Sequence, residues 1–335
     1  MPLSSITLRY MVAELQGLVN ARLQGIVELK PGLYRLSFPK GRDLLVETGE
    51  RVNLTGYRMQ APAKAFQATM VLRKHISGKI LRGISQHNFD RIIMLDFGSY
   101  KLVAELFADG NLLLVNSEWL VLWVQTGRAW SSRVLRRGEV YKFPDERPDP
   151  TKFDREEFSS RMAGGKTIAS SLSRHLLAGK LLVEELCHRA GVSPLAEPNA
   201  PASAALFNAW KEILAGAPDP CIQSGEVLPF AFRSLPEPQT KYATLSEAVE
   251  ELYAGRIAPQ TSGRLEQLER RLAQQLDSIS KLEAESAALK ASGDSIYENW
   301  ELVEKAIAAA KSSDGKALAL LRASKDGFRV TVDLP

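Results

Sequence analysis

The chain has 335 residues, of which 45% are hydrophobic and 24% charged, values typical of a globular protein of two or three domains. No apolar run approaches the roughly 20 residues that span a membrane, and no basic stretch followed by an apolar core opens the chain, so we expect neither a membrane span nor a signal peptide. The two cysteines, Cys187 and Cys221, are too few for a disulfide scaffold or a four-cysteine zinc site, and a cytoplasmic location fits them best.

The charges are unevenly distributed along the chain. Residues 1–144 hold 20 Lys and Arg residues against 11 Asp and Glu residues, a net charge of +9. The remaining residues hold 23 against 28, a net charge of −5. A basic first part suggests a polyanionic partner for that part of the protein.

The first 144 residues predict two helices and a series of strands. One helix covers residues 4–24, with Ser4 or Ser5 as its cap. The other covers Ala65–Lys74 and ends in basic residues that complement its dipole. Alternating apolar residues between turn residues predict nine strands, at Ile26–Leu29, Leu33–Phe38, Asp43–Glu47, Arg51–Leu54, Ile80–Gln86, Arg91–Phe97, Tyr100–Phe107, Leu112–Asn116 and Leu120–Gln125. The pattern indicates an α+β fold with a β-rich N-terminal domain over residues 1–145.

A helical domain is predicted over residues 156–255, after a proline-containing linker at 144–155. Within it, residues 177–192 hold a glycine-containing turn and a helix that ends at Gly191. This is a loose helix-hairpin-helix pattern. Such hairpins set backbone amides against phosphates, and they also serve as packing units; the pattern fits both uses.

Residues 262–311 predict the first half of a coiled coil, interrupted at Ser292-Gly293-Asp294. Its apolar heptad positions are Leu265, Leu268, Leu272, Ile279, Leu282 and Leu289. Residues 312–335 form a terminal segment in which 328–335 alternate like a strand. Because a single coiled-coil helix needs a partner, we expect either that the chain is a fragment or that this arm associates with another chain.

The sequence offers little for enzyme chemistry. Gly164-Gly165-Lys166-Thr167 lacks the earlier glycine of a phosphate-binding loop, and the four histidines do not stand at metal-ligand spacing. Glu184 and Glu185 are adjacent on a helix, so we expect them to face different ways and to be solvated rather than to form a catalytic pair. The sequence therefore predicts no enzyme activity, no cofactor and no metal.

An Asp-Arg pair, Asp90-Arg91, stands at the start of an apolar strand within residues 86–97. A guanidinium group beside a carboxylate in fixed geometry suits nucleic-acid recognition. The alternative is a salt bridge at the end of the strand, of a kind that contributes little.

Basic residues alternate with aromatic residues further along the N-terminal domain. Trp119, Trp123 and Trp130 are interleaved with cations that we expect to contact an RNA backbone, namely Arg128, Arg133, Arg136, Arg137 and Lys142. The alternative is that the tryptophans fill the core and the arginines are solvated, and we expect Trp119 or Trp123 to be in the core.

Several segments together resemble the NFACT family of ribosome-associated quality control factors. They are the opening helix from Ser5 to Leu15, the second helix with Phe66 and Leu72-Arg73-Lys74, and the runs Gln86–Arg91, Phe97–Asn111 and Arg137–Pro144. Residues 179–191 resemble the helix-hairpin-helix module of the family, and residues 262–311 the first half of its coiled coil.

The resemblance implies a formamidopyrimidine-DNA-glycosylase-type N-terminal domain and a role on the ribosome. Family members bind a large ribosomal subunit that carries peptidyl-tRNA, recruit tRNA and extend the nascent chain without a template, while the ribosome forms the peptide bonds. By resemblance, Asp90 and Arg91 contact tRNA, and we add Arg9, Arg73 and Lys74 from the two helices. The implied partners are tRNA and the rRNA of the large subunit.

One departure and two alternatives accompany this resemblance. Relatives often have an aspartate at the position of Thr7 that is tied to chain tailing, so tailing is in question here. The opening Met1-Pro2 also resembles DNA glycosylases that use an N-terminal proline, although Leu3 stands where those enzymes have glutamate. A surface adhesin is the other alternative, and it lacks support from an export signal.

Overall fold

The computed structural model describes residues 2–57, 59–144, 147–238, 240–257, 259–312, 314–326 and 329–333. The chain divides into two compact units, Met1–Arg256 and Ile257–Pro335. Among the described residues, none of the helices combines the length and apolar character that a membrane crossing requires.

The first unit opens with helix α1 (Ser5–Leu15), whose N-terminus is capped by the Ser4 side chain. The helix is shorter than predicted. A 3-10 turn at Gln16–Leu18 follows, and Asn20 then takes a left-handed conformation with φ of 68°, so the prediction of a helix to residue 24 was wrong. The apolar residues after residue 15 are buried by the turn instead.

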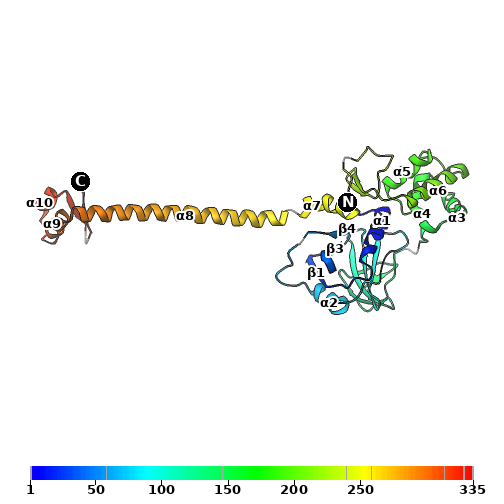
Figure 1. The fold of residues 1–335 in the computed structure, drawn as a ribbon, viewed down its shortest axis with the longest axis horizontal. Coiled ribbons are helices and arrows are strands. Elements are labelled where there is room, and N and C mark those ends of the chain that lie inside the picture. Colours follow the sequence, from blue (N-terminus) through cyan, green and yellow to red (C-terminus); the bar gives the residue numbers. More distant parts are fainter. Residues whose placement is uncertain are drawn as a thin grey trace. The chain divides into compact units, whose positions relative to one another are not determined.

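Two antiparallel sheets follow (Figure 1). The nine predicted strands are all present in them. The first sheet has the order β1-β2-β3-β4, from Gly25–Lys30, Leu33–Phe38, Arg42–Glu47 and Arg51–Thr55. The second has the order β5-β6-β7-β8-β9, from Gly83–Gln86, Ile92–Asp96, Tyr100–Glu105, Asn111–Asn116 and Val121–Val124. Helix α2 (Gln67–Ile76) lies between the sheets in sequence and contacts β1.

The second sheet is buried on both faces, which explains its almost continuous apolar strands. Leu102, Leu112 and Leu114 belong to the main core, which also contains residues of the first sheet and of α1. Val103 and Leu113 point to a smaller core on the other face, closed by Leu135 and Tyr141. The short strands β10 (Arg128–Ala129) and β11 (Val134–Leu135) lie in this covering segment. Trp119 and Trp123 are both partly buried, against the smaller and the main core respectively.

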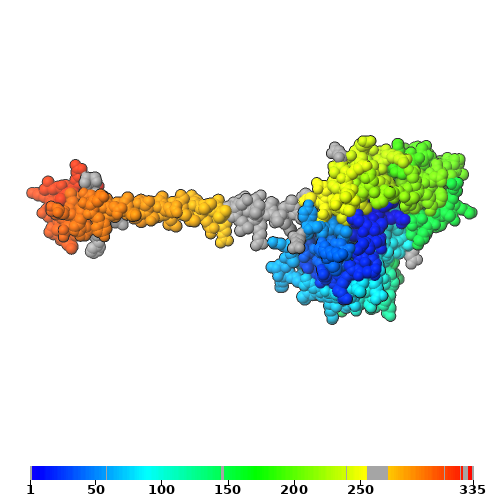
Figure 2. Space-filling view, in the orientation of Figure 1, coloured from blue at the N-terminus to red at the C-terminus, as the bar shows by residue number. Residues whose placement is uncertain are grey.

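The helical part belongs to the same compact unit as the sheets, although the sequence separates residues 1–145 from 156–255. It consists of α3 (Arg155–Met162), α4 (Ile168–His175), α5 (Lys180–Ala190), α6 (Ala200–Ala215), the hairpin β12 (Cys221–Gln223) and β13 (Glu226–Leu228), and α7 (Leu245–Ile257). Figure 2 shows the N-terminal residues, in dark blue, at the surface between sheet residues and the yellow-green residues of the helical part.

Helix α1 makes several of the polar contacts that join the two parts of this unit. The Tyr10 hydroxyl donates to the backbone oxygens of Ile213 at 2.7 Å and Gly216 at 2.9 Å. The Glu14 carboxylate accepts from the first backbone amides of α7, those of Leu245 and Ser246, at 2.7 and 3.2 Å. A carboxylate at a helix N-terminus satisfies free amides and complements the helix dipole, so α1 caps α7.

The second unit holds α8 (Pro259–Glu298), α9 (Trp300–Lys311), α10 (Gly315–Leu320) and the antiparallel pair β14 (Ala323–Asp326) and β15 (Arg329–Val332). The expected interruption at Ser292-Gly293-Asp294 was wrong, because α8 continues to Glu298 (Figure 1). A single glycine inside a long helix costs about 1 kcal/mol and does not end it.

The apolar stripe of α8 is solvent-exposed within the described part of the chain. Ile279 and Leu289 are 52% and 67% exposed. The pairing of this helix in a coiled coil therefore stays a prediction. The side chains of Leu265 and Leu268, and the predicted strand residues Phe328, Leu334 and Pro335, lie outside the described residues.

Candidate nucleic-acid interface

Asp90 and Arg91 occupy the tight connection between β5 and β6. Two successive residues before them, Asn88 and Phe89, have left-handed φ angles of 41° and 61°. Such a conformation is costly for residues with a side chain and persists only where surrounding contacts enforce it. Gln86 supplies part of this support, since its Nε2 donates to the backbone oxygens of Ser5 and Asp90, both at 2.9 Å.

Phe89 anchors the same connection to the helical part of the unit. Its side chain is buried, and its ring meets Trp210 of α6 edge to face, with 5.2 Å between ring centroids. Trp210 is itself fully buried, and its Nε1 donates to the backbone oxygen of Pro150 at 3.1 Å. The loop that carries Asp90 and Arg91 is therefore held from both sides.

The side chains of Asp90 and Arg91 form no ion pair with each other. Asp90 Oδ1 accepts instead from the backbone amide of Arg91 at 2.7 Å. Within the described ranges, the Arg91 guanidinium group has no hydrogen-bond or ion-pair partner; every exposed or buried salt bridge found there involves other arginines and lysines. The alternative of a strand-end salt bridge between these two residues is thus excluded.

Arg91 lines a cavity of about 420 Å³ between α1, the start of α5 and the β12–β13 hairpin. Other lining residues include Ser4, Gly179, Lys180, Glu226 and Phe232. Gly179 is the N-cap of α5 and places no side chain on the first amides of that helix. A guanidinium group, an ammonium group and a helix N-terminus thus border one cavity and can contact an anionic ligand there, beside the Glu226 carboxyl group, whose pKa burial raises.

The turn and helix predicted over residues 177–192 are present as a short turn and α5, which ends at Gly191 with φ of 65°, and α4 precedes them. Leu177 in the turn has a left-handed φ of 52°, and Leu182 and Leu186 of α5 are buried. The structure thus shows a packed helical hairpin. Its use against phosphates stays a prediction.

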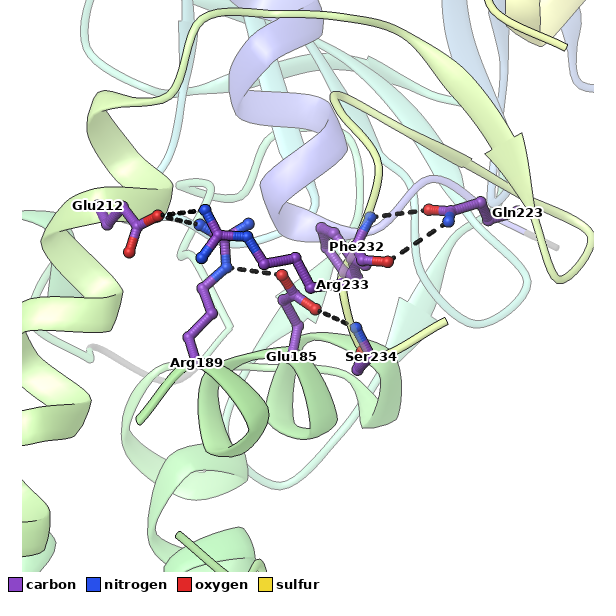
Figure 3. A network of polar contacts seen from close by, with 7 residues as sticks. All are labelled: Glu185, Arg189, Glu212, Gln223, Phe232, Arg233 and Ser234. Carbon is purple, nitrogen blue, oxygen red and sulfur yellow. Dashed lines mark hydrogen bonds and ion pairs between the residues drawn. The ribbon is translucent and has the colours of Figure 1, made fainter. Parts of the chain in front are cut away.

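A polar network, buried at Glu185 and Gln223, holds the segment 230–236, of which Phe232 lines the cavity (Figure 3). Glu185 of α5 accepts from Arg189 Nε at 2.6 Å and from the Ser234 amide at 2.9 Å. Arg189 and Arg233 both donate to Glu212 of α6 at 3.0 Å. Burial alone would raise the pKa of Glu185, but these hydrogen bonds outweigh it and hold the pKa below its ordinary value.

The prediction that Glu185 is solvated was therefore wrong: the residue is completely buried, while Glu184 is 40% exposed at its side chain. In the same network, the Gln223 side chain accepts from the Phe232 amide at 2.8 Å and donates to the Pro236 oxygen at 2.7 Å. Sequence reasoning missed this network. The only local signal was the spacing of four residues between Glu185 and Arg189, which places both on one helix face.

His87 is the first residue of the connection between β5 and β6, and its ring stacks on Phe143, with ring centroids 3.6 Å apart and planes 8° from parallel. Burial lowers the pKa of His87, and the nearby Asp90 and Asp149 carboxylates only partly oppose this. The folded state therefore binds the proton less readily than the unfolded state, whose histidines titrate near 6.5. Stability is accordingly present above that pH and is lost as the pH falls through it.

We therefore expect the free energy of unfolding to fall between pH 7 and pH 5, and to fall less in His87→Phe, which keeps the ring stack without a titrating group. Denaturant unfolding of both proteins at several pH values measures the difference. His75 and His175 also have lowered pKa values and leave a residual pH dependence. An identical pH dependence in the two proteins would contradict the assignment.

The structure separates the predicted RNA-backbone cations into two groups. Arg133 is buried and makes a bidentate ion pair with Glu105, at 2.6 and 3.2 Å. Because Glu105 binds its guanidinium group, the prediction that Arg133 contacts an RNA backbone was wrong, and the residue is structural. Arg128 pairs with Asp109 at 3.1 Å, whereas Arg136, Arg137 and Lys142 are exposed.

The three predicted cations of the helices lie apart from Arg91. Arg9 is half-buried on α1, and its side chain has no polar partner in the described part of the chain. Arg73 and Lys74 are exposed in the last turn of α2, where Arg73 Nε donates to the Ile26 oxygen at 2.9 Å. Arg91 and Lys180 thus line the same cavity, whereas no residue of α2 lines it.

Thr7, which stands where relatives often have an aspartate, is completely buried. Its Oγ1 donates to the Val227 oxygen at 2.9 Å and is also 2.8 Å from the Ser4 hydroxyl. A threonine here therefore serves the contact between α1 and β13. Over the same described ranges, no three His, Cys, Asp or Glu side chains gather in a way that would hold a metal ion.

Comparison with known families places this fold. The family model for the NFACT N-terminal and middle domains matches residues 4–317. The chain belongs to the NFACT family. An archaeal Rqc2 homologue from Methanocaldococcus jannaschii is 28% identical over 91% of this chain and 51% of its own length. The human ribosome quality control complex subunit NEMF is 33% identical over 36% of this chain and 12% of its own length.

This NFACT chain spans about half the length of the archaeal relative. Among solved structures, the N-terminal part of a fibronectin/fibrinogen-binding protein from Streptococcus suis is 21% identical, with a TM-score of 0.64 over 75% of this chain and 98% of that one. A fibrinogen-binding protein from Staphylococcus aureus is 18% identical, with a TM-score of 0.60 over the same shares. These likenesses confirm the α+β fold predicted from the sequence.

Proposed function

We propose that this NFACT protein acts in ribosome-associated quality control. It binds large ribosomal subunits that carry peptidyl-tRNA and recruits tRNA through Asp90 and Arg91 for template-free C-terminal tailing. The ribosome supplies the peptide-bond chemistry, so the protein itself is not an enzyme. The proposal also places it in the cytoplasm, where its RNA partners are.

The observation that carries the proposal is the Arg91 guanidinium group, which has no partner among the described residues, in a cavity next to Lys180 and the start of α5. A free guanidinium group held on a rigid loop can bind a phosphate or a base edge bidentately. Asp90 orients the Arg91 backbone through its 2.7 Å contact with the amide. The name of the human relative, a ribosome quality control complex subunit, supports a ribosomal setting.

The glycosylase alternative receives less support. Leu3, at the position of the catalytic glutamate of those enzymes, is 4% exposed and packs in the main core. Its backbone amide donates to the Glu50 oxygen at 2.9 Å. An apolar residue in that position supplies no acid or base.

We expect Arg91→Ala to weaken tRNA binding roughly ten-fold, which corresponds to about 1.4 kcal/mol, because a base or phosphate contact of this kind is worth about 1–3 kcal/mol. Binding of labelled tRNA, and of large subunits bearing peptidyl-tRNA, is measured across a salt series. Asp90→Asn retains an acceptor for the Arg91 amide and should bind better than Asp90→Ala.

The matched control is Arg155→Ala, which removes an exposed arginine of α3 outside the cavity. It should bind tRNA as the wild type does. If Arg91→Ala binds tRNA as tightly as Arg155→Ala, Arg91 does not contact tRNA and the site assignment fails.

A further inference from the structure

A second group of cations lies at the far end of β6 and β7 from Arg91. Arg91 directly precedes β6, whereas Tyr100 begins β7 after the turn that follows Asp96. At about 3.3 Å per strand residue, the six residues from Arg91 to Phe97 span roughly 20 Å. A ligand at one end of these strands therefore leaves the other end open.

We name this group the Tyr100 patch, and it consists of Lys74, His75, Lys79, Arg82, Tyr100 and Arg137. The His75 ring meets the Tyr100 ring with 5.1 Å between centroids. Lys79 Nζ lies 5.2 Å from the centroid of the same ring. Arg82 lies against the β6–β7 turn, since a Cβ atom built on Gly98 would be 3.1 Å from its Nε atom.

Arg137 reaches this group from the covering segment after β11. Burial lowers the pKa of His75, and the charges of Lys74, Arg137 and Lys79 lower it further. The sheet register places Arg137 at the same end, because the Gly138 amide donates to the Val121 oxygen, Val121 pairs with Val115, and Val115 pairs with Lys101 next to Tyr100. The patch thus gathers residues from α2, from the segment before β5, from β7 and from residues 136–138.

The cations of the patch lack acidic partners in the part of the chain that the structure describes. Within the ranges that the structure describes, Lys74, Lys79, Arg82 and Arg137 form no ion pair, whereas Arg35, Arg128 and Arg133 of the same unit each pair with a carboxylate. The nearest acidic residue of the turn, Asp96, contacts Lys101 at 3.9 Å and the Gly98 amide at 2.7 Å. Unpaired charges of one sign repel one another, and an anionic partner removes that cost.

The ring of Tyr100 helps to define the partner. Single-stranded RNA is bound chiefly by stacking its bases on exposed aromatic faces. Here Lys79 lies over the Tyr100 ring and His75 meets it as well, so the ring is not a free stacking platform. The patch instead offers charge alone, which suits the regularly spaced phosphates of an RNA duplex.

We propose that the Tyr100 patch binds the phosphate backbone of double-stranded RNA, as a second RNA contact separate from the Asp90-Arg91 cavity. The inference deepens the proposed function and rests on its RNA-binding part. It assigns tRNA to the cavity and a neighbouring RNA helix to the patch, so that one domain contacts two RNA elements at once.

The test measures binding of the full chain to a labelled RNA duplex of about 16 base pairs, to a single strand of equal length and to tRNA. The double variant Lys79→Glu/Arg137→Glu should lower duplex affinity at least ten-fold and reduce the slope of log affinity against log salt by about 2, since each lost phosphate contact removes about one unit. Lys166→Glu/Lys211→Glu carries the same change in net charge on exposed residues of the helical part and should bind the duplex nearly as the wild type does.

The outcomes separate this inference from the proposed function. If the patch variant keeps wild-type duplex affinity, or if the single strand binds more tightly than the duplex, the duplex site is overturned whatever Arg91→Ala does to tRNA. If Arg91→Ala loses duplex binding as strongly as the patch variant, a single surface binds both RNAs and the inference also fails. If the patch variant loses the duplex while Arg91→Ala keeps tRNA, the patch is supported and the Asp-Arg assignment fails.

Discussion

Replacing Arg133 by alanine is expected to lower the free energy of unfolding by about 3–5 kcal/mol, the cost of breaking a buried ion pair. Glu105 would remain buried with only the Tyr141 hydroxyl, 3.0 Å away, as a side-chain donor. Burial, together with the Glu105 charge, raises the pKa of Tyr141 well above its ordinary value, so this hydroxyl stays protonated and cannot replace the lost cation.

Denaturant unfolding of Arg133→Ala and Arg128→Ala provides the comparison. Arg128 pairs with the 81% exposed Asp109 side chain, and its loss should cost less than about 1 kcal/mol. The double variant Arg133→Met/Glu105→Leu should recover much of the stability, because apolar residues can replace a buried pair. Equal losses for the two single variants would show that Arg133 is not buried as the structure has it.

Replacing Trp210 by alanine is expected to cost about 3–5 kcal/mol of unfolding free energy, as for other large buried aromatic residues. The change empties the site against which Phe89 packs and removes the hydrogen bond to Pro150. We also expect weaker tRNA binding at a temperature where the variant is folded, because the strained loop before Asp90 loses its support from α6.

The matched control is Trp300→Ala on the exposed face of α9, where the side chain is 52% exposed and the change should stay within about 0.5 kcal/mol. Trp210→Phe keeps a ring beside Phe89 and should preserve tRNA binding better than Trp210→Ala. If Trp210→Ala lowers stability and leaves tRNA affinity untouched, the packing between Phe89 and Trp210 does not position the loop.

The strands could be predicted from the sequence because each rests on local alternation and on nearby turn residues. Lys30-Pro31-Gly32 and Asp109-Gly110-Asn111, for example, end one strand and begin the next. The α1 boundary failed for a related reason: the apolar spacing continued past residue 15, while the backbone changed to a 3-10 turn that buries the same residues.

The candidate site could be predicted only in part. Asp90 and Arg91 were found because they are adjacent in sequence, but the cavity also needs Lys180 and Glu226, which only tertiary packing brings near. The same limit applies to charge. Arg133 and Arg136 look alike in sequence, yet one is paired with Glu105, 28 residues away, and the other is exposed.

The contacts of α1 also bear on how the protein is made. Tyr10 bonds to Ile213 across 203 residues, and Glu14 caps an α7 amide across 231 residues. During synthesis from the N-terminus, these partners leave the ribosome long after the helix does. The apolar face of α1 therefore stays partly uncovered until about 245 residues have emerged. This fold is completed late in translation, and in a nascent chain that stalls before α7 the first unit is incomplete.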